Sequence, residues 1–300
     1  MTGNGADFDE TDGVTSLSAF YDTAHFLARC MRYRLHTEKL EIKTLMQLDL
    51  TGATALDIGA NKGIYCFWML RAVGRAGRVV AFEPQPEMAE AIRQKQARFG
   101  WVNLRVIEVA LSDAEGKLNL ARDWVGDGAA SLEASRHRAG QDTLEVPVTR
   151  LDALSDDLSA NLKFIKCDVE EHERSVFRGG EQMLRRHRPV VQFESTAGGE
   201  QTLQIFQFFR DLGYSGVLLL GDRYLPHANP DNVRHYKFGL GGHRDYLFFP
   251  PEAIGTTIPH SLGVAVSRRS NEVLGRGFTM AFLASPLVGQ GGAHRQMRDE

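Results

Sequence analysis

Hydrophobic and polar residues follow two different rhythms along the chain. Between residues 16 and 50, apolar residues return every three or four positions, which predicts an N-terminal helical segment (Phe20, Ala24, Leu27, Ala28, Met31 and Leu35). From residue 53, short apolar runs typical of buried strands alternate with amphipathic stretches typical of helices. Residues 1–13 are polar and acidic, which predicts a disordered start, and residues 251–300 form a C-terminal extension without an assignable pattern.

The alternation between residues 51 and 250 predicts one α/β domain. Strands are expected over 53–59, 78–84, 104–111, 162–169, 189–195, 214–221 and 245–250, with helices between most of them. Strands separated by helices indicate a mainly parallel sheet covered on both faces. Residues 112–160 interrupt this order: two half-exposed strands, "GKLNLAR" and "TLEVPVTRL", flank a loop of small and polar residues that contains "GDGAASLEASRH". Long polar loops in compact domains often have a function, which makes this loop a candidate for contact with the substrate.

Composition narrows the choice of partner and compartment. The chain of 300 residues has 43% hydrophobic and 24% charged residues and a formal net charge of −3, so no basic field points to nucleic acid. The longest apolar runs, such as "GVLLLG", are too short to span a membrane. Cys30, Cys66 and Cys167 are far apart and form no CxxC pair, and the N-terminus does not resemble a signal peptide. We therefore expect reduced thiols and a cytoplasmic protein, whose oligomeric state, a homodimer included, stays open.

The clearest chemical motif is the turn in "TALDIGANKGIYCF", residues 54–67. Gly59, Asn61 and Gly63 follow an apolar strand, but Asn61 stands where a dinucleotide fingerprint has its second glycine. The lysine and hydroxyl of a phosphate-binding P-loop are missing too. Asp57, at the end of the strand, would repel a pyrophosphate and attract an ammonium group.

A second candidate for binding the cofactor is Glu83. It ends the next strand, 26 residues after Asp57, and an acidic residue at this point of an α/β fold binds the hydroxyls of a ribose. The implied ligand has a ribose and a cationic end with no phosphate between them. S-adenosylmethionine fits this description.

These residues belong to a longer series of motifs. "DIGANKG", "AFEPQPE", "VALSDAEGKLNL", "VPVTRLDAL" and "LKFIKCDVEEHE" resemble, in their order and spacing, the FkbM-type S-adenosylmethionine-dependent methyltransferases. The resemblance covers about residues 53–250. It implies a class I methyltransferase fold, a Rossmann-like sheet of seven strands whose last strand is antiparallel, and methyl transfer to a hydroxyl of a sugar, a glycan or a natural product.

The resemblance also implies roles for single residues. Those lining the methionine end of the cofactor would be Asp57, Gly59, Asn61 and Gly63, and Glu83 would bind the ribose. Leu111, Ser112 and Asp113 would border the adenine, and Asp168 would lie beside the reacting methyl group. One departure is Glu171, where the family usually has glycine, which raises the question of whether the backbone takes the same path there.

An alcohol acceptor needs a base or a metal ion to remove its proton. The segment "CDVEEHER" offers Asp168, Glu170 and His172 at the end of a strand, and Glu194 ends the following strand. We expect His172 to be the base, slightly ahead of Asp168 and Glu170, because its intrinsic pKa is near neutral. The neighbouring Glu171 is expected to be solvated, as is Glu173.

Three alternatives remain at this stage. Asp168, Glu170 and Glu194 could bind a divalent cation, but their spacing is not diagnostic and we do not favour a metal. The sheet could belong to a nicotinamide-dependent oxidoreductase, against which Asp57 and Asn61 argue. The chain could also bind S-adenosylmethionine without catalysing a reaction.

Overall fold

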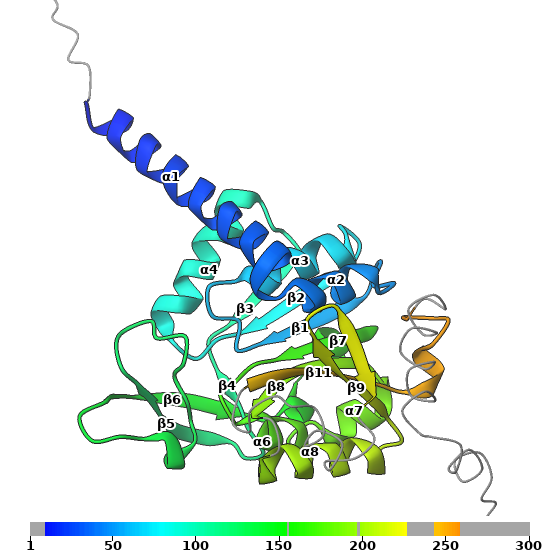
Figure 1. Cartoon of the computed structure of the whole chain (residues 1–300). Helices are drawn as coiled ribbons and strands as arrows, with labels where there is room; N and C mark the ends of the chain where they lie inside the picture. The colour runs from blue at the N-terminus through cyan, green and yellow to red at the C-terminus, as the bar shows by residue number, and fades with distance from the viewer. Residues whose placement is uncertain (1–9, 155, 197–198, 227–242, 259–300) are drawn as a thin grey trace, which may run out of the picture.

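The computed structural model describes residues 10–154, 156–196, 199–226 and 243–258. The chain begins with helix α1 (Glu10–Arg32), a turn of π-helix η1 (Tyr33–Thr37) and helix α2 (Lys39–Gln47). The helical N-terminal segment is thereby confirmed, although α1 already starts within the stretch predicted to be disordered. Figure 1 shows that the first half of α1 extends away from the body of the protein.

The central sheet has the strand order β10-β9-β11-β8-β7-β1-β2-β3. Its strands, in the order of the chain, are β1 (Thr54–Ile58), β2 (Arg78–Phe82), β3 (Leu104–Ile107), β7 (Leu162–Cys167), β8 (Val190–Thr196), β9 (Ser215–Leu220), β10 (Arg223–Pro226) and β11 (His243–Phe249). Neighbours from β3 to β8 pair in parallel, whereas β11 is antiparallel to both β8 and β9. The strand order reverses between β1 and β7, and such a switch point is where open α/β sheets bind ligands.

The expected class I methyltransferase fold is confirmed, with a correction to the number of strands. Seven strands were predicted, and the described residues form eight in this sheet. The additional strand, β10, follows β9 after a two-residue turn at Gly221 and Asp222 and pairs with it in antiparallel fashion. This short edge hairpin was missed because its four residues have no apolar run of their own.

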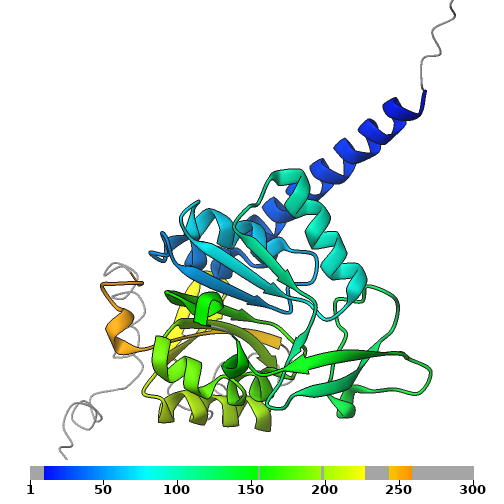
Figure 2. The same ribbon diagram turned by 180° about the vertical axis from the view of Figure 1, so that it is seen from behind.

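Helices cover both faces of the sheet. One face packs against α2 and α3 (Ile64–Val73), and α4 (Pro86–Phe99) contributes Ile92 to the same core. The opposite face packs against α6 (Glu173–Arg178), α7 (Glu181–His187) and α8 (Glu200–Asp211), as the two views in Figures 1 and 2 show. Between the strands predicted over 162–169 and 189–195, the helical segment is split into α6 and α7 at Gly179 and Gly180. A Cβ at Gly179 would lie 1.9 Å from the backbone oxygen of Ser112, so the two backbone segments are too close together for any side chain at position 179.

A second, small sheet is inserted between β3 and β7. It contains β4 (Ala110–Leu111), β5 (Gly116–Arg122) and β6 (Asp142–Thr149), and its long β5–β6 hairpin projects beside the main sheet. The strand predicted over 104–111 is therefore divided between two sheets. The remaining short elements are 3-10 turns and one helical turn: η2 (Ala134–Arg136), η3 (Leu151–Ala153), α5 (Asp156–Ser159) and η4 (Pro251–Ala253).

The N-terminal helix buries a different face from the one that its apolar pattern suggests. Phe26 and Cys30 are buried in the main core, whereas Phe20, Met31 and Leu35 are exposed. Within the described residues, no helix is both long and apolar enough to cross a membrane.

Candidate active site

The glycine turn after β1 packs tightly against the end of β7. Gly59 has a φ of +78°, and a Cβ on it would lie 1.9 Å from the backbone oxygen of Asp168. Asn61 also has a positive φ, +49°, which asparagine tolerates better than most residues. Gly63, with a φ of +76°, is the N-cap of α3. The motif residues are thus needed to bring β1, β7 and the start of α3 together at the switch point.

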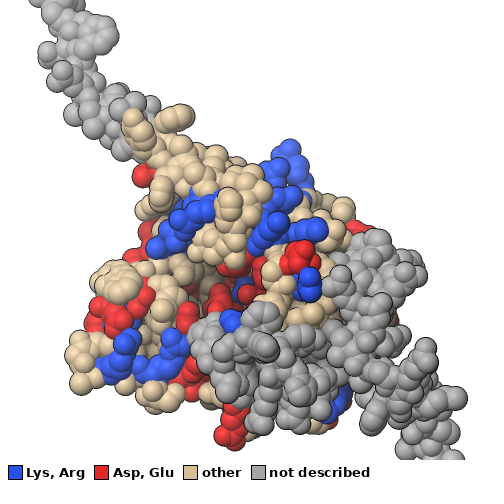
Figure 3. Space-filling model, in the orientation of Figure 1, with Lys and Arg blue, Asp and Glu red and all other residues tan. Residues whose placement is uncertain are grey.

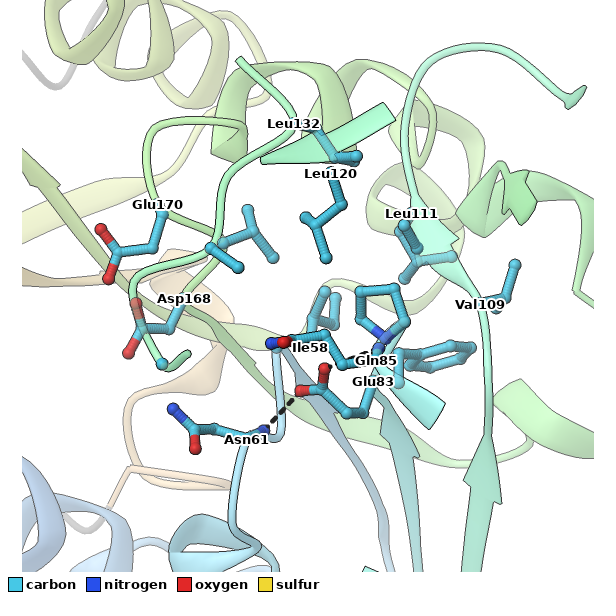
Figure 4. Close-up of a pocket in the computed structure, with 17 residues that line it drawn as sticks. Ile58, Asn61, Glu83, Gln85, Val109, Leu111, Leu120, Leu132, Asp168 and Glu170 are labelled. Carbon is cyan, nitrogen blue, oxygen red and sulfur yellow. Dashed lines mark hydrogen bonds between the residues drawn. The ribbon is translucent and has the colours of Figure 1, made fainter. Parts of the chain in front are cut away.

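Glu83 points into the space above this turn, as Figure 4 shows. Its side chain is buried, and its two oxygens accept hydrogen bonds from the backbone N–H groups of Asn61 (2.7 Å) and Gln85 (3.0 Å). Burial raises the pKa of Glu83 to about 7, while the two N–H donors act in the opposite direction. The carboxylate is therefore held in one orientation before any ligand arrives.

A pocket of about 620 Å³, including its open mouth, lies over Glu83. We call it the Glu83 pocket. Its polar lining includes Asn61, Gln85, Asp168 and Glu170, and its apolar lining includes Ile58, Phe82, Val109, Leu111, Leu120 and Leu132. A polar edge at one side and an apolar slot at the other suit a flat heterocycle joined to a sugar.

Gln85 is a site residue that the sequence reasoning missed. It is buried, its amide nitrogen donates to the backbone oxygen of Asp127 (2.8 Å), and its Oε1 has no hydrogen-bond partner among the described residues. A buried acceptor without a partner at a pocket wall is ready for a donor group of a ligand. Its place two residues after Glu83 was the available clue.

The loop over residues 126–137, for which the sequence predicts contact with the substrate, lies against the Glu83 pocket. We refer to it as the functional loop. Gly128, Ala130 and Leu132 line the pocket, and a Cβ on Gly128 would lie 2.6 Å from Asn61 Nδ2. The loop is fixed at its middle because the Ser131 hydroxyl donates to the backbone oxygen of Glu170 (2.6 Å). The loop thus forms a wall of the site.

Asp57 faces a second space on the other side of the glycine turn. It is almost fully buried, Cys66 Sγ donates to its Oδ2 (3.0 Å), and burial raises its pKa to about 6. It lines a hollow of about 490 Å³, including its open mouth, that we call the Lys166 pocket. This pocket shares Gly59, Asn61 and Asp168 with the Glu83 pocket, so the two spaces meet at the end of β7.

Lys166 is the charged centre of the second pocket. Its ammonium group lies 3.4 Å from Asp168 Oδ2, 3.6 Å from Asp245 Oδ1 and 5.1 Å from the centre of the Tyr65 ring, and its side chain is only 2% exposed. These carboxylates hold its pKa well above the usual range, although burial alone would lower it. Lys166 thereby fixes the position of the Asp168 carboxylate.

Glu194 lies directly opposite Asp245 in the β8–β11 pair. Burial, followed by the charges of Asp168 and Asp245, raises its pKa to about 8. Glu38, between η1 and α2, also lines the Lys166 pocket, and burial raises its pKa to about 7. Sequence reasoning missed Glu38, Lys166 and Asp245, because they come from segments outside any local motif.

His172 lies outside both pockets, in contrast to the position expected of a base. It is buried, its Nδ1 lies 2.6 Å from Glu133 Oε1, and its Nε2 lies 2.9 Å from Ser112 Oγ. Both ring nitrogens are thus occupied in joining the functional loop to the end of β4. Of the residues expected at the adenine, Leu111 lines the Glu83 pocket, whereas Ser112 turns to His172 and Asp113 is exposed.

The acidic residues after β7 have distinct surroundings. Glu170 forms an ion pair with Arg136 (3.1 Å), and Glu171 accepts a hydrogen bond from Thr196 Oγ1 (2.8 Å). Glu171 has a φ of +75°, so the backbone takes the left-handed path that glycine would adopt with less strain.

The prediction that Glu171 and Glu173 are solvated was wrong for Glu173. This residue is almost fully buried and accepts a hydrogen bond from the backbone N–H of Val169 (3.0 Å), because it lies in the first turn of α6 and turns back to the preceding loop. Glu171 is half-buried. Within the described residues, no group of three or more potential ligands is arranged to hold a metal ion.

The sheet order, the glycine turn after β1 and the buried carboxylate after β2 define a class I methyltransferase fold. The family profile of the methyltransferase FkbM domain matches residues 57–215, more than half of the chain. The chain belongs to this family. No curated protein sequence matches it.

Solved structures with similar folds are distant. An FkbM methyltransferase from Methylobacillus flagellatus KT is 16% identical with a TM-score of 0.44, over 66% of this chain and 44% of that one. The present chain thus spans less than half of that protein. A precorrin-6y C5,15-methyltransferase from Geobacter metallireducens GS-15 is 15% identical (TM-score 0.39, 69% of this chain and 85% of that one). A SAM-dependent methyltransferase from Aquifex aeolicus is 17% identical (TM-score 0.38, 73% and 91%). The assignment to the family rests on the match over residues 57–215.

Proposed function

We propose that this protein transfers a methyl group from S-adenosylmethionine to a hydroxyl of a sugar, glycan or natural-product acceptor. The observation that carries the proposal is Glu83: a buried carboxylate, oriented by two backbone N–H groups at the end of β2, beneath a pocket with an apolar slot. We also propose residues 51–250 as the methyltransferase domain, with residues 1–50 as a helical segment and residues 251–300 as an extension.

The residues on both sides of the glycine turn fit the cofactor. In the Glu83 pocket, Glu83 would accept hydrogen bonds from the ribose hydroxyls, and the unpaired Gln85 Oε1 would accept one from the adenine amino group. In the Lys166 pocket, the buried Asp57 carboxyl suits the ammonium group of the methionine end. Gly59, Asn61 and Gly63 hold the turn between the two ends, and Leu111 borders the adenine.

The bound cofactor supplies an activated methyl group on a sulfonium, and the acceptor must lose a proton as it is methylated. We propose Asp168 as the base, since it is the carboxylate that borders both pockets and its side chain is one-third exposed. Lys166 holds Asp168 in position. Glu170 lines the Glu83 pocket and Glu194 lies near Asp168, and both remain candidates for the same role.

His172 receives a different role in this proposal. Its two nitrogens join Glu133 of the functional loop to Ser112, so it would position the loop and not accept the proton of the substrate. This replaces the preference for His172 that the sequence alone suggested.

Two measurements test the proposal. In a thermal-shift comparison, S-adenosylhomocysteine should raise the melting temperature and NAD should not, because only a ligand that binds the folded state stabilises it. A screen of glycans and hydroxylated metabolites with labelled S-adenosylmethionine should then identify an acceptor. Stabilisation by NAD alone would favour an oxidoreductase. Binding of S-adenosylhomocysteine without any methylated product would favour a binding protein.

A further inference from the structure

A basic groove lies between α1 and α4, beyond the Lys166 pocket. Its volume is about 890 Å³, including its open mouth, and its cationic lining comes from Arg29, Lys62, Lys95 and Arg98. Phe26 and Phe99 also line it. Lys and Arg side chains gather along this side of α1 in Figure 3, whereas the central hollow below them is rich in Asp and Glu.

The positive charge of this groove is poorly compensated. Among the described residues, Arg29, Lys62 and Lys95 form no ion pair with a carboxylate, and Asp22 is the one acidic residue among those that line the groove. The whole chain has a net charge of −3, so the excess of cations is local. Like charges held together raise the free energy of the folded protein unless an anion offsets them.

The cationic groups are also held in place. Lys95 Nζ donates to the backbone oxygen of Ala91 (3.0 Å) and lies 5.2 Å from the centre of the Phe26 ring. Burial lowers the pKa of Lys95, and the charges of Lys62 and Arg29 lower it further. Arg29 Nε is buried without a hydrogen-bond partner among the described residues. A donor that is already desolvated and unpaired gains more from an anion than a free surface donor does.

We propose that this groove binds a phosphate group of the methyl acceptor, so that the acceptor is a phosphorylated sugar or another phosphate ester. Several cations around one open space suit a multiply charged phosphate better than a single carboxylate. Arg29 and Lys62 line both the groove and the Lys166 pocket, which extends to Asp57 and Asp168. A ligand anchored in the groove can therefore extend toward the proposed site of methyl transfer. The connection between the groove and a site of methyl transfer rests on the proposed function.

The test uses inorganic pyrophosphate as the probe and the full chain saturated with S-adenosylhomocysteine. Calorimetry at low salt should show saturable binding that weakens as the salt concentration rises. Lys95→Gln should weaken it about tenfold, the effect of losing one hydrogen bond to a charged group, and Lys95→Arg should largely retain it. Lys43→Gln is the matched control, since Lys43 is exposed on α2 and lines neither the groove nor the two pockets.

A second arm compares glucose 1-phosphate with glucose, and we expect the phosphate ester to bind at least about tenfold more tightly. The proposal is overturned if pyrophosphate does not bind saturably, or if Lys95→Gln and Lys43→Gln behave alike. It is also overturned if pyrophosphate and S-adenosylhomocysteine exclude each other, because the cations would then serve the carboxylate of the cofactor. The affinity for S-adenosylhomocysteine, measured in parallel, separates a failure of this inference from a failure of the proposed function.

Discussion

The Glu83 pocket and the Lys166 pocket meet at Gly59 and Asp168 but are constructed differently. In the first pocket, the orienting hydrogen bonds come from the backbone: Glu83 accepts them from the N–H groups of Gln85, two residues later, and of Asn61, 22 residues earlier. In the second, the charged groups come from separate parts of the chain, with Glu38 from the N-terminal segment and Lys166 from β7.

The two constructions differ in how far each pocket can change when side chains are substituted. Backbone donors remain when side chains are substituted, so a pocket that uses them keeps its ligand while the sequence varies. Side-chain charges from distant segments can be exchanged one at a time. We infer that the first pocket serves the nucleoside part of the common cofactor. The second pocket, which would take the methionine end at Asp57, would also select the particular acceptor through its other charged residues.

The largest expected effect follows from removing the proposed base. Asp168→Asn should lower the turnover number about 10²–10⁴-fold, the usual contribution of general-base catalysis, and change the affinity for S-adenosylhomocysteine far less. The measurement is a steady-state assay with an acceptor from the screen. His172→Ala is the comparison: it should lower the free energy of unfolding by about 1–3 kcal/mol, because the buried Ser112 and the half-buried Glu133 each lose a hydrogen bond. A loss of turnover confined to the His172 variant would return the role of the base to His172.

The glycine turn can be tested with a matched pair of substitutions. Gly59 and Gly52 have similar positive φ values, +78° and +71°, but a Cβ would collide only at Gly59, since no atom lies within 4 Å of its place at Gly52. Gly52→Ala should cost about 1–2 kcal/mol of the free energy of unfolding from the backbone conformation alone. Gly59→Ala adds overpacking and should cost about 3 kcal/mol or more. Urea unfolding measures both values, and equal costs would show that the contact with β7 is unimportant.

The buried carboxyl groups predict a smaller effect, on the pH dependence of stability. Burial raises the pKa of Glu173 to about 8 and that of Glu83 to about 7, above the ordinary value of 4.5. At pH values between the ordinary pKa of 4.5 and the raised pKa, these carboxyl groups are protonated in the folded protein and ionised in the unfolded chain. The free energy of unfolding of the ligand-free protein should therefore fall as the pH rises from about 5 to 8. Each such carboxyl contributes at most about 1.4 kcal/mol per pH unit.

Glu173→Gln removes one titrating group and keeps an acceptor for the Val169 N–H group. Its free energy of unfolding should therefore fall less steeply with pH than that of the parent protein. Chemical unfolding at several pH values provides the comparison. Curves that run parallel from pH 5 to 8 would mean that the pKa of Glu173 is not raised.

How far the sequence predicted the molecule depends on how local each feature is. The strand that contains Asp57, the strand before Glu83 and the glycine turn were predicted, because each is encoded by a short run of residues. The hairpin strand β10 was missed, and the break at Gly179 results from a contact with Ser112, 67 residues earlier in the chain (179 − 112). The position of His172 depends in the same way on Glu133 and Ser112.

The same limit applies within the candidate site. Asp168 and Glu194 were singled out by their positions at the ends of strands. The lysine that holds Asp168 in place was not, because in the sequence Lys166 is only one polar residue within a strand. Asp245 and Glu38 come from segments that approach Lys166 only in the folded chain. Their positions beside Lys166 depend on tertiary packing, which cannot be predicted from a local sequence pattern.

The central claim is that Glu83 binds the ribose of S-adenosylmethionine. Calorimetric titration of S-adenosylhomocysteine into the parent protein and into Glu83→Ala tests it most directly. We expect one site per chain in the parent and a loss of about 1–3 kcal/mol of binding free energy in the variant, the range for hydrogen bonds to a charged group. An equal affinity in the two proteins, or no binding to the parent, would contradict the account.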